Sequence, residues 1–342
     1  MTAERSPSPH VRAAHHLVRA AVMAPSLHNS QPWLFAYADS ALLMYADYRR
    51  RLPFCDPHGR QLTISCGAAL FNLRLAIRHL GFRPVVRLFP EVGTSWLLAR
   101  VGWGAYAKVT PEVELMHQAL RRRHTHRGPF SAARVPASLV EALARHARAE
   151  GVQLVALEDA TARGRLSRLV HEAEARERRV PGFREELLRW SRPFGNDRGD
   201  GVPAEACAFH PDCVALAGRD FTGLTRRRAT ARPRETWPAR TGLMVVLTTP
   251  RDTRQDWLRA GQALQRVLLC AAGHEFAAGF HTQPLEFADL RALVRTLAPS
   301  GQHPQMVLRL GRINWQVRTP RRSPAEVLPR DTVAPTGTGH AA

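Results

Sequence analysis

The spacing of hydrophobic and polar residues divides the chain into alternating helices and strands. Apolar residues recur at steps of three and four in segments such as 66–80 and 256–273, as in helices buried along one face. Short apolar runs bounded by Gly, Pro, Asn or Asp, such as 41–45 and 242–248, predict strands. The predicted helices are 10–23, 66–80, 111–122, 136–149, 161–178 and 256–273, and the predicted strands are 33–37, 41–45, 84–89, 96–102, 152–157, 242–248 and 305–311. This pattern indicates an α+β protein.

Two stretches of this pattern resemble each other. Gly67–Ala76 aligns with Gly261–Cys270, each a helix opened by Gly, and a strand follows each in the same order. Those strands end in related phrases, Ala99–Gly102 and Leu308–Gly311. A helix and a strand repeated in one order favour an internal duplication. We therefore expect an N-terminal half at 8–107 and a C-terminal half at 108–322.

The regular pattern loosens in two places. Pro, Gly and Arg become frequent at 179–240, where Phe183, Trp190, Phe194 and Trp237 are interspersed. A long irregular stretch with aromatic residues is typical of a lid that docks on the rest of a protein. Residues 323–342 are predicted to form a flexible tail.

Composition and charge narrow the class of protein. Of the 342 residues, 44% are hydrophobic, and the net charge is +20. Arginine supplies nearly all of the positive charges, because Lys108 is the only lysine. The arginines are scattered, and no helix-turn-helix, zinc-finger or RNA-binding signature accompanies them, so we expect no nucleic-acid partner. No apolar run is long enough to span a membrane and the N-terminus lacks a signal peptide, so a cytoplasmic protein is expected. Cys207, His210 and Cys213 match no standard zinc spacing, so no metal site is predicted.

Two polar motifs carry the candidate chemistry. The turn Ala24–Trp33 presents hydroxyl, amide and backbone N–H groups that suit a flat polar ligand. The segment Arg123–Arg127 supplies guanidinium and hydroxyl donors about a hundred residues later. Taken singly, Arg121–Arg123 fits a helix C-terminus, the turn fits a plain helix-to-strand connection, and Arg321-Arg322 fits a pair of charges in a tail.

Together these motifs resemble the FMN-dependent nitroreductase family, and specifically its single-chain, Acg-like branch. The segments that carry the resemblance are Ala24–Trp33, Arg123–Arg127, Gly261–Ala272, Gln283–Glu286, Arg309–Arg312 and Pro320–Arg322. The resemblance implies a nitroreductase-like fold duplicated within one chain, which would make the protein a pseudo-dimer that stays a monomer or a weak dimer. The second half lacks a turn like Ala24–Trp33, and its counterpart at 145–151 differs, so one complete flavin site and one decayed site are expected.

The resemblance also implies roles for individual residues. Arg123 and Thr125 would bind the FMN phosphate and ribityl oxygens, and Arg321 and Arg322 would complete the phosphate clamp. Arg127 would lie near the pyrimidine edge of the flavin, where a positive charge stabilises the reduced anion. The remaining candidates are the turn residues Pro25, Ser26, Asn29 and Gln31 at the isoalloxazine, the backbone around Gln283, Pro284 and Leu285 at flavin N5, and His124 and Arg312 within the matching motifs.

The implied function is that of an oxidoreductase in which NAD(P)H delivers hydride to the flavin and a nitroaromatic or quinone accepts the electrons. Because the flavin carries that chemistry, no side chain is predicted to act as a catalytic nucleophile or base. The alternative is a catalytically silent flavoprotein that stores or sequesters FMN beneath the 179–240 lid. A weaker alternative is a basic interaction protein without flavin.

Overall fold

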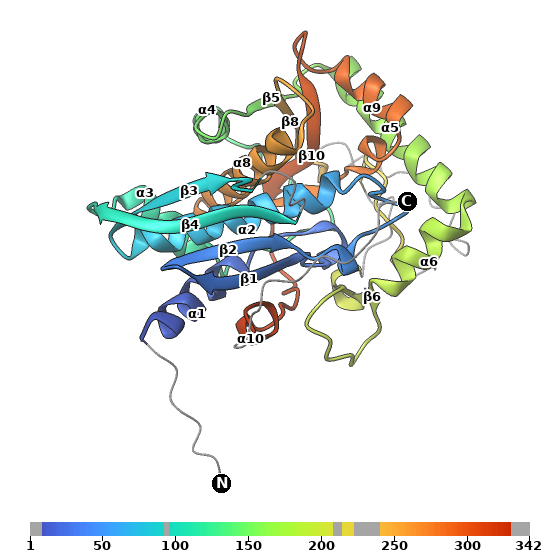
Figure 1. Cartoon of the computed structure of the whole chain (residues 1–342). Helices are drawn as coiled ribbons and strands as arrows, with labels where there is room; N and C mark the ends of the chain where they lie inside the picture. The colour runs from blue at the N-terminus through green and yellow to red at the C-terminus, as the bar shows by residue number, and fades with distance from the viewer. Residues whose placement is uncertain (1–8, 92–95, 208–213, 222–239, 330–342) are drawn as a thin grey trace.

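Two antiparallel four-stranded sheets form the framework of the protein (Figure 1). The computed structural model describes residues 9–91, 96–207, 214–221 and 240–329. The first sheet has the strand order β1-β2-β4-β3, and the second has the order β5-β8-β10-β9. The strands are β1 (Trp33–Ala38), β2 (Ala41–Ala46), β3 (Phe82–Leu88), β4 (Leu97–Tyr106), β5 (Gln153–Ala156), β8 (Leu243–Thr249), β9 (Phe276–Phe280) and β10 (His303–Arg312).

Helices cover these sheets and connect them. The helices are α1 (Pro9–Ala21), α2 (Arg60–His79), α3 (Pro111–Ala119), α4 (Ala137–Arg148), α5 (Ala160–Arg179), α6 (Pro181–Arg189), α8 (Arg254–Gly273), α9 (Ala288–Arg295) and α10 (Pro324–Val327). The apolar face of α2 joins the core of the first sheet, and that of α8 joins the core of the second. In both sheets the strand that directly follows the long helix, β3 or β9, lies at the edge.

Helices α2 and α8 pack against each other, and they do so through two glycines. A Cβ atom added to Gly67 would lie 2.2 Å from the carbonyl oxygen of Leu258, and one added to Gly261 would lie 1.9 Å from that of Ile64. Only glycine permits this approach of the two backbones. The contact joins the two halves at the two residues that open the repeated sequence.

Most of the predicted elements are confirmed, with ends shifted by a few residues. Local signals account for several of the helix starts. The Asp159 side chain accepts a hydrogen bond from the backbone N–H of Ala162 at the start of α5, and Thr253 and Asp256 form a capping box at the start of α8.

Other elements were not predicted. Helix α2 begins at Arg60 rather than at 66, because the polar stretch before Cys66 is buried against the other half instead of forming a loop. The Arg60 side chain donates to the carbonyl oxygen and to Oε1 of Gln305 on β10, at 3.0 and 2.9 Å. Strand β9 is rich in Ala and Gly, which gives it little strand signal of its own.

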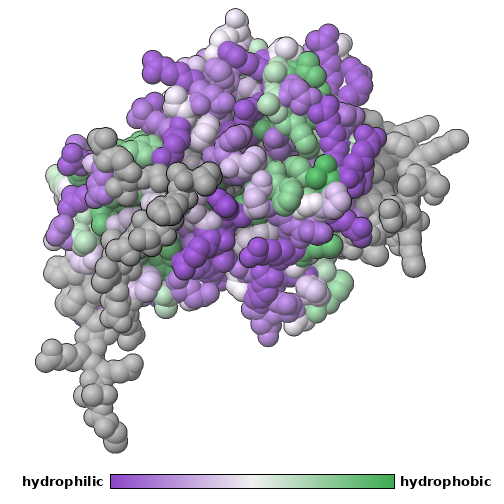
Figure 2. Space-filling model, turned by 45° about the vertical axis from the view of Figure 1, so that its right-hand side comes forward, coloured by the Kyte–Doolittle hydropathy of each residue, from purple (hydrophilic) through white to green (hydrophobic). Residues whose placement is uncertain are grey.

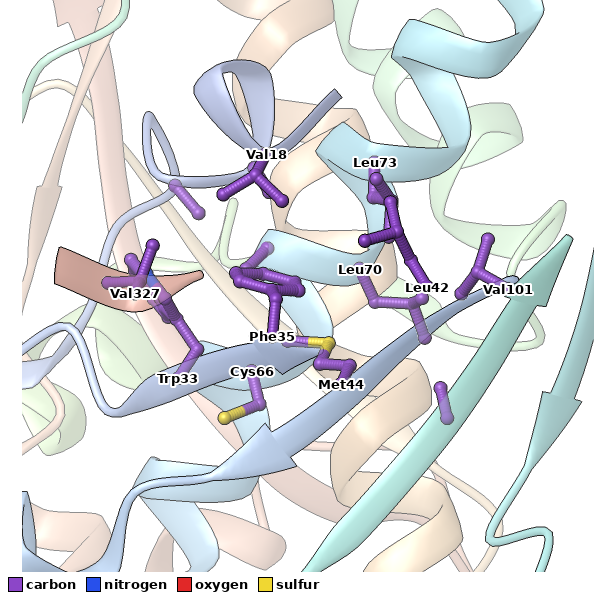
Figure 3. Close-up of a cluster of buried hydrophobic side chains, with 14 of the residues drawn as sticks. Val18, Trp33, Phe35, Leu42, Met44, Cys66, Leu70, Leu73, Val101 and Val327 are labelled. Atoms are coloured by element: carbon purple, nitrogen blue, oxygen red, sulfur yellow. The ribbon is translucent and has the colours of Figure 1, made fainter. Parts of the chain in front are cut away.

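The predicted flexible tail is wrong for its first residues. Ser323 and Glu326 form a capping box around α10, and Val327 and Leu328 are buried in the first half's core. Figure 3 shows Val327 beside Trp33 in this core. A short helix far along the chain is stabilised here by burial that local sequence does not reveal. The rest of the tail, 330–342, lies outside the described residues.

The stretch predicted as a lid contains regular structure. Beyond α6 it forms a two-stranded parallel pair, β6 (Ser191–Arg192) and β7 (Val202–Pro203). Trp190 packs in a buried cluster with Leu52 and Cys55 of the first half. Phe194 is 75% exposed, so it docks on nothing in the described structure. Trp237 lies outside the described residues.

One face of the molecule is largely polar. Figure 2 shows one face on which hydrophilic residues predominate, with hydrophobic residues in small groups among them. Among the helices of the described residues, none combines the length and the apolar character of a membrane span. Within the same ranges, no group of three or more His, Cys, Asp or Glu is arranged to hold a metal ion. Two residues of the rejected zinc spacing, His210 and Cys213, are not among those described.

Candidate functional site

A cavity opens between the two halves of the chain. The empty space within it is about 1020 Å³, a value that includes open solvent at its mouth. Residues from both halves line it: Pro25–His28, Gln61, Ile64 and Ser65 from the first, and Thr125–Arg127, Leu264, Phe280–Thr282, Met306 and Arg309 from the second. Cys207 and Gly218–Phe221, from the stretch predicted as a lid, complete the lining.

The turn that forms one wall of the cavity has an unusual backbone. His28, Asn29 and Gln31 have φ angles of 52°, 56° and 50°, in the left-handed region that residues other than glycine rarely adopt. The Ser26 hydroxyl accepts a hydrogen bond from the backbone N–H of Gln31 at 2.8 Å, which closes the turn. Such strain is found mostly at functional sites. Two predicted residues of this turn, Pro25 and Ser26, line the cavity.

Three buried arginines form a cationic cluster beside the cavity, defined here as Arg123, Arg127 and Arg321. Neither Arg123 nor Arg321 lines the cavity itself. Arg127 lines the cavity, and Arg123 and Arg321 both donate to the carbonyl oxygen of Met23, at 3.1 and 3.5 Å. Burial lowers the pKa of Arg123 to about 10. The pKa of Arg321 is lowered by burial and further by the positive charges of Arg123 and Arg127. The guanidinium of Arg321 is therefore repelled by both of the others in a poorly solvated place.

The cationic cluster has hydrogen-bonding capacity that the described part of the chain does not use. Nε of Arg123, Nη1 of Arg127 and Nε of Arg321 are buried and have no hydrogen-bond partner there. No carboxylate within the described residues forms an ion pair with any of the three. Buried positive charges are costly unless an anion compensates them, and guanidinium donors suit phosphate oxygens. The cluster therefore fits a phosphate group.

Three other predicted residues are engaged in holding the chain rather than in lining the cavity. Asn29 donates to the carbonyl oxygens of Gly201 and Pro320 at 2.9 and 3.1 Å, and its Oδ1 accepts from Arg321 at 3.2 Å. Gln31 donates to the carbonyl oxygen of Gly199 and accepts from the backbone N–H of Arg322, each at 2.8 Å. Asn29, Gln31 and Arg322 thus connect the turn to the C-terminal segment that carries Arg321.

His124 and Arg312 lie on a second hollow beside β9, outside the cavity lining. His124 Nδ1 accepts from the backbone N–H of Thr319 at 3.3 Å, and burial with the charges of Arg123 and Arg321 lowers its pKa to about 3. His124 is therefore neutral at physiological pH. Arg312 pairs with Glu275 at 3.2 Å on the surface.

The predicted segment at 283–285 forms a short 3-10 helix whose residues are buried just behind the cavity. Thr282 lines the cavity, whereas Gln283, Pro284 and Leu285 do not. Gln283 donates to the carbonyl oxygen of Ala217 at 3.2 Å, and Leu285 accepts from Arg60 at 3.3 Å.

Two residues of the cavity lining, Arg309 and His281, were not among the predicted site residues, although Arg309 opens a segment that carries the family resemblance. Arg309 donates from Nε to Nε2 of His281 at 2.9 Å and to the carbonyl oxygen of Gly128. Burial and the charge of Arg309 lower the pKa of His281 to about 3, so the imidazole stays neutral as an acceptor at Nε2. The available signal was a lone arginine inside the apolar run of β10.

A buried acidic cluster lies next to the cavity and consists of Glu174, Glu177 and Glu286 around Arg219. Arg219 donates to Glu177 at 3.0 Å and also to Glu286. Burial is the main cause that raises the pKa of each carboxyl group, and the pKa of Glu174 reaches about 8. Oε2 of Glu174 has no hydrogen-bond partner in the described structure.

Glu174→Gln is expected to stabilise the protein at pH 8 by on the order of 1–3 kcal/mol and to have little effect near pH 4. The folded chain holds a proton on Glu174 up to about pH 8, whereas an unfolded chain releases it near 4.5. The wild type therefore loses stability as the pH rises through that interval, and the variant loses less. Urea unfolding across this range tests the effect. The exposed Glu172→Gln on the same helix is the control, and equal pH slopes for wild type and Glu174→Gln would contradict the prediction.

The fold and site thus define a class: an α+β protein with two antiparallel sheets and, beside its cavity, an arginine cluster suited to phosphate. No family model matches the chain. The protein of Mycobacterium tuberculosis H37Rv named "Putative NAD(P)H nitroreductase Rv3131" is 32% identical over 326 residues, covering 94% of this chain and 92% of that protein. "Putative NAD(P)H nitroreductase acg" from the same strain is 31% identical over 296 residues, covering 86% of this chain and 87% of that protein. The chain belongs to this nitroreductase family, which includes Acg.

Solved nitroreductases align with part of the chain. A nitroreductase with bound FMN from Desulfitobacterium hafniense is 15% identical and covers 61% of this chain and 93% of its own, with a TM-score of 0.36. A nitroreductase with bound FMN from Bacteroides fragilis is 12% identical and covers 66% of this chain and 98% of its own, also with a TM-score of 0.36.

Proposed function

We propose that this chain is an FMN-dependent oxidoreductase of the nitroreductase type, which uses NAD(P)H to reduce a small aromatic acceptor such as a nitroaromatic or a quinone. The observation that carries the proposal is the cationic cluster, whose unused buried donors lie beside a cavity that residues of both polar motifs line. The names of the relatives support the same reaction type.

In this proposal, different residues of the chain bind the phosphate, the ribityl chain and the ring system of FMN. Arg123 and Arg321 hold the phosphate, and the Thr125 hydroxyl binds the ribityl chain. Arg127 and Ser26 line the cavity where the ring system would lie, and the charge of Arg127 favours an anionic reduced ring. When bound, FMN supplies the hydride and electron transfer, so the protein needs no acid or base of its own for that step.

We also propose that the two halves arose by duplication and form a pseudo-dimer with one complete site. Supporting this, the strand orders β1-β2-β4-β3 and β5-β8-β10-β9 correspond one to one along the chain. The equivalent glycines Gly67 and Gly261 meet where α2 crosses α8. A chain that contains both halves would work as a monomer or a weak dimer.

The proposed reaction predicts that the purified protein binds one FMN per chain and that NADH or NADPH bleaches the flavin absorbance rapidly without oxygen. Stopped-flow absorbance under anaerobic conditions measures this, followed by reoxidation with a nitroaromatic or quinone. Failure to bind added FMN would overturn the proposal.

Binding without reduction would instead support a second function, the storage or sequestration of FMN. One observation favours it. Phe221 lies in the cavity wall, with its ring 5.4 Å from that of His28 and 5.6 Å from the guanidinium of Arg127. An aromatic ring there could occupy the space that nicotinamide needs, so Phe221→Ala would then restore reduction.

A further inference from the structure

Arg219 lies at the centre of the acidic cluster and is the link between that cluster and the cavity. Its guanidinium is 8% exposed and donates to Glu177 on α5 and to Glu286 beyond the 283–285 turn. The same guanidinium lies 3.7 Å from Sγ of Cys55 in the first half. One side chain therefore contacts both halves from within the stretch that connects β5 to β8.

The neighbours of Arg219 on the chain form part of the cavity wall. Gly218, Asp220 and Phe221 line the cavity with it. Ala217, just before this wall, is held independently of Arg219. Its carbonyl oxygen accepts hydrogen bonds from Nδ1 of His281 at 3.0 Å and from Gln283. The Phe221 carbonyl accepts from Ser191, which belongs to the same connecting stretch.

The charges of this group do not balance by simple pairing. Glu177 and Glu286 face one guanidinium, and their side chains are 6% and 0% exposed. Two ionised carboxylates would leave an excess negative charge in a poorly solvated place, and two neutral ones would leave Arg219 unpaired. The compensated state has one proton shared between the two carboxyl groups.

We propose that Arg219 is a positioning residue that holds Gly218–Phe221 as a wall of the cavity, and that it does so best while Glu177 and Glu286 together carry one negative charge. Both more acidic and more alkaline conditions then loosen the wall. Other groups face the cluster from each packed element: Glu174 and Arg178 on α5, Glu186 on α6, and His28, Cys55 and Asp56 from the first half.

The surroundings support titration near neutral pH. Burial raises the pKa of Glu177 and of Glu286, and for Glu177 the neighbouring carboxyl of Glu286 raises it further. Burial lowers the pKa of His28, and the charges of Arg219 and Arg127 lower it further, so His28 contributes no charge there. The alkaline change is therefore assigned to the glutamates.

Hydrogen–deuterium exchange of the full chain without added flavin tests the proposal. Arg219→Gln should speed exchange in peptides covering 218–221 by about tenfold or more, with little change in β8 and β10. The matched control is Arg176→Gln, since Arg176 pairs with Glu172 and Asp289 on the surface, outside the acidic cluster. Unchanged exchange at 218–221 in Arg219→Gln would overturn the proposal.

A pH series separates positioning from a general loss of folding, and it applies even if Arg219→Gln does not fold. In the wild type, exchange at 218–221, corrected for the intrinsic pH dependence, should pass through a minimum. Glu177→Gln combined with Glu174→Gln should remove the rise on the alkaline side, because Glu286 is then the only carboxylate of the acidic cluster that balances Arg219 at every higher pH. Arg219→Lys should restore part of the protection. A flat corrected profile in the wild type, or an alkaline rise kept when Glu174 and Glu177 are both replaced by Gln, would contradict the proposal.

A second arm rests on the proposed function and is read separately. If the cavity binds FMN, Arg219→Gln should release it about tenfold faster or more in a fluorescence dissociation assay. Faster exchange with no flavin binding in the wild type would sink the proposed function and leave the role of Arg219 intact. If the wild type binds flavin but neither exchange nor flavin release changes in Arg219→Gln, the proposed function stands and the role of Arg219 is overturned.

Discussion

Arg123→Met is expected to weaken FMN binding by about 10- to 100-fold while raising the stability of the ligand-free chain. A hydrogen bond to a charged group contributes about 1.5–3 kcal/mol, which corresponds to that loss of affinity. Without a ligand, Arg123 is a buried cation that repels Arg321, and its only side-chain hydrogen bond within the described residues is to the Met23 carbonyl. Replacing it with an apolar chain of similar length should therefore stabilise the fold by about 1–2 kcal/mol.

Two measurements on the same variant check this: fluorescence titration of flavin-free protein with FMN, and urea unfolding without FMN. Arg322→Met is the informative control. The sequence predicts a phosphate contact for Arg322 as well, but in the structure its guanidinium lies 4.0 Å from Asp47 and donates to the carbonyl oxygens of Gln31 and Glu326. Its replacement should change FMN affinity much less. A loss of ligand-free stability in Arg123→Met would indicate a structural role for Arg123 instead of an anion site.

Gly261→Ala should destabilise the protein by about 3 kcal/mol or more and reduce the yield of folded chain. The added methyl group would lie 1.9 Å from the Ile64 carbonyl oxygen and 2.8 Å from Cα of Gly67. Both obstacles are backbone, so α2 and α8 must separate, and overpacking in a rigid core costs 1–3 kcal/mol or more. Urea unfolding followed by circular dichroism measures the loss.

The control is Gly164→Ala on α5, where the added Cβ would meet only the flexible end of Arg168 at 3.9 Å. That substitution should stabilise the helix by about 0.5–1 kcal/mol, since Ala loses less backbone entropy than Gly. If Gly261→Ala is as well tolerated as Gly164→Ala, the close crossing of α2 and α8 is wrong.

The sequence predicted much of the fold because most elements carry their own signals. The apolar spacing in α8, together with Thr253 and Asp256 at its start, requires no information from elsewhere in the chain. The elements missed are those whose stability comes from distant partners. The first turns of α2 are polar in sequence, yet Arg60 is buried because Gln305 satisfies it.

The same distinction applies to the cavity. Arg127 and Ser26 could be proposed from motifs, and both line it. Asn29 and Gln31 belong to the same motif as Ser26, but their amides donate to the carbonyl oxygens of Gly201 and Gly199, far along the chain. No local sequence pattern predicts these two hydrogen bonds. Arg219 lies in none of the sequence motifs.

By itself, the sequence determined the alternation of helices and strands, the similarity between 67–76 and 261–270, and the residue types of the two polar motifs, because these depend on neighbours along the chain. The tertiary structure alone decided which arginines share a buried space without a counter-charge and which meet carboxylates. Arg123 and Arg219 look alike in the sequence. One is buried with Arg321, the other between Glu177 and Glu286. Charge compensation depends on distances between groups that only folding brings together.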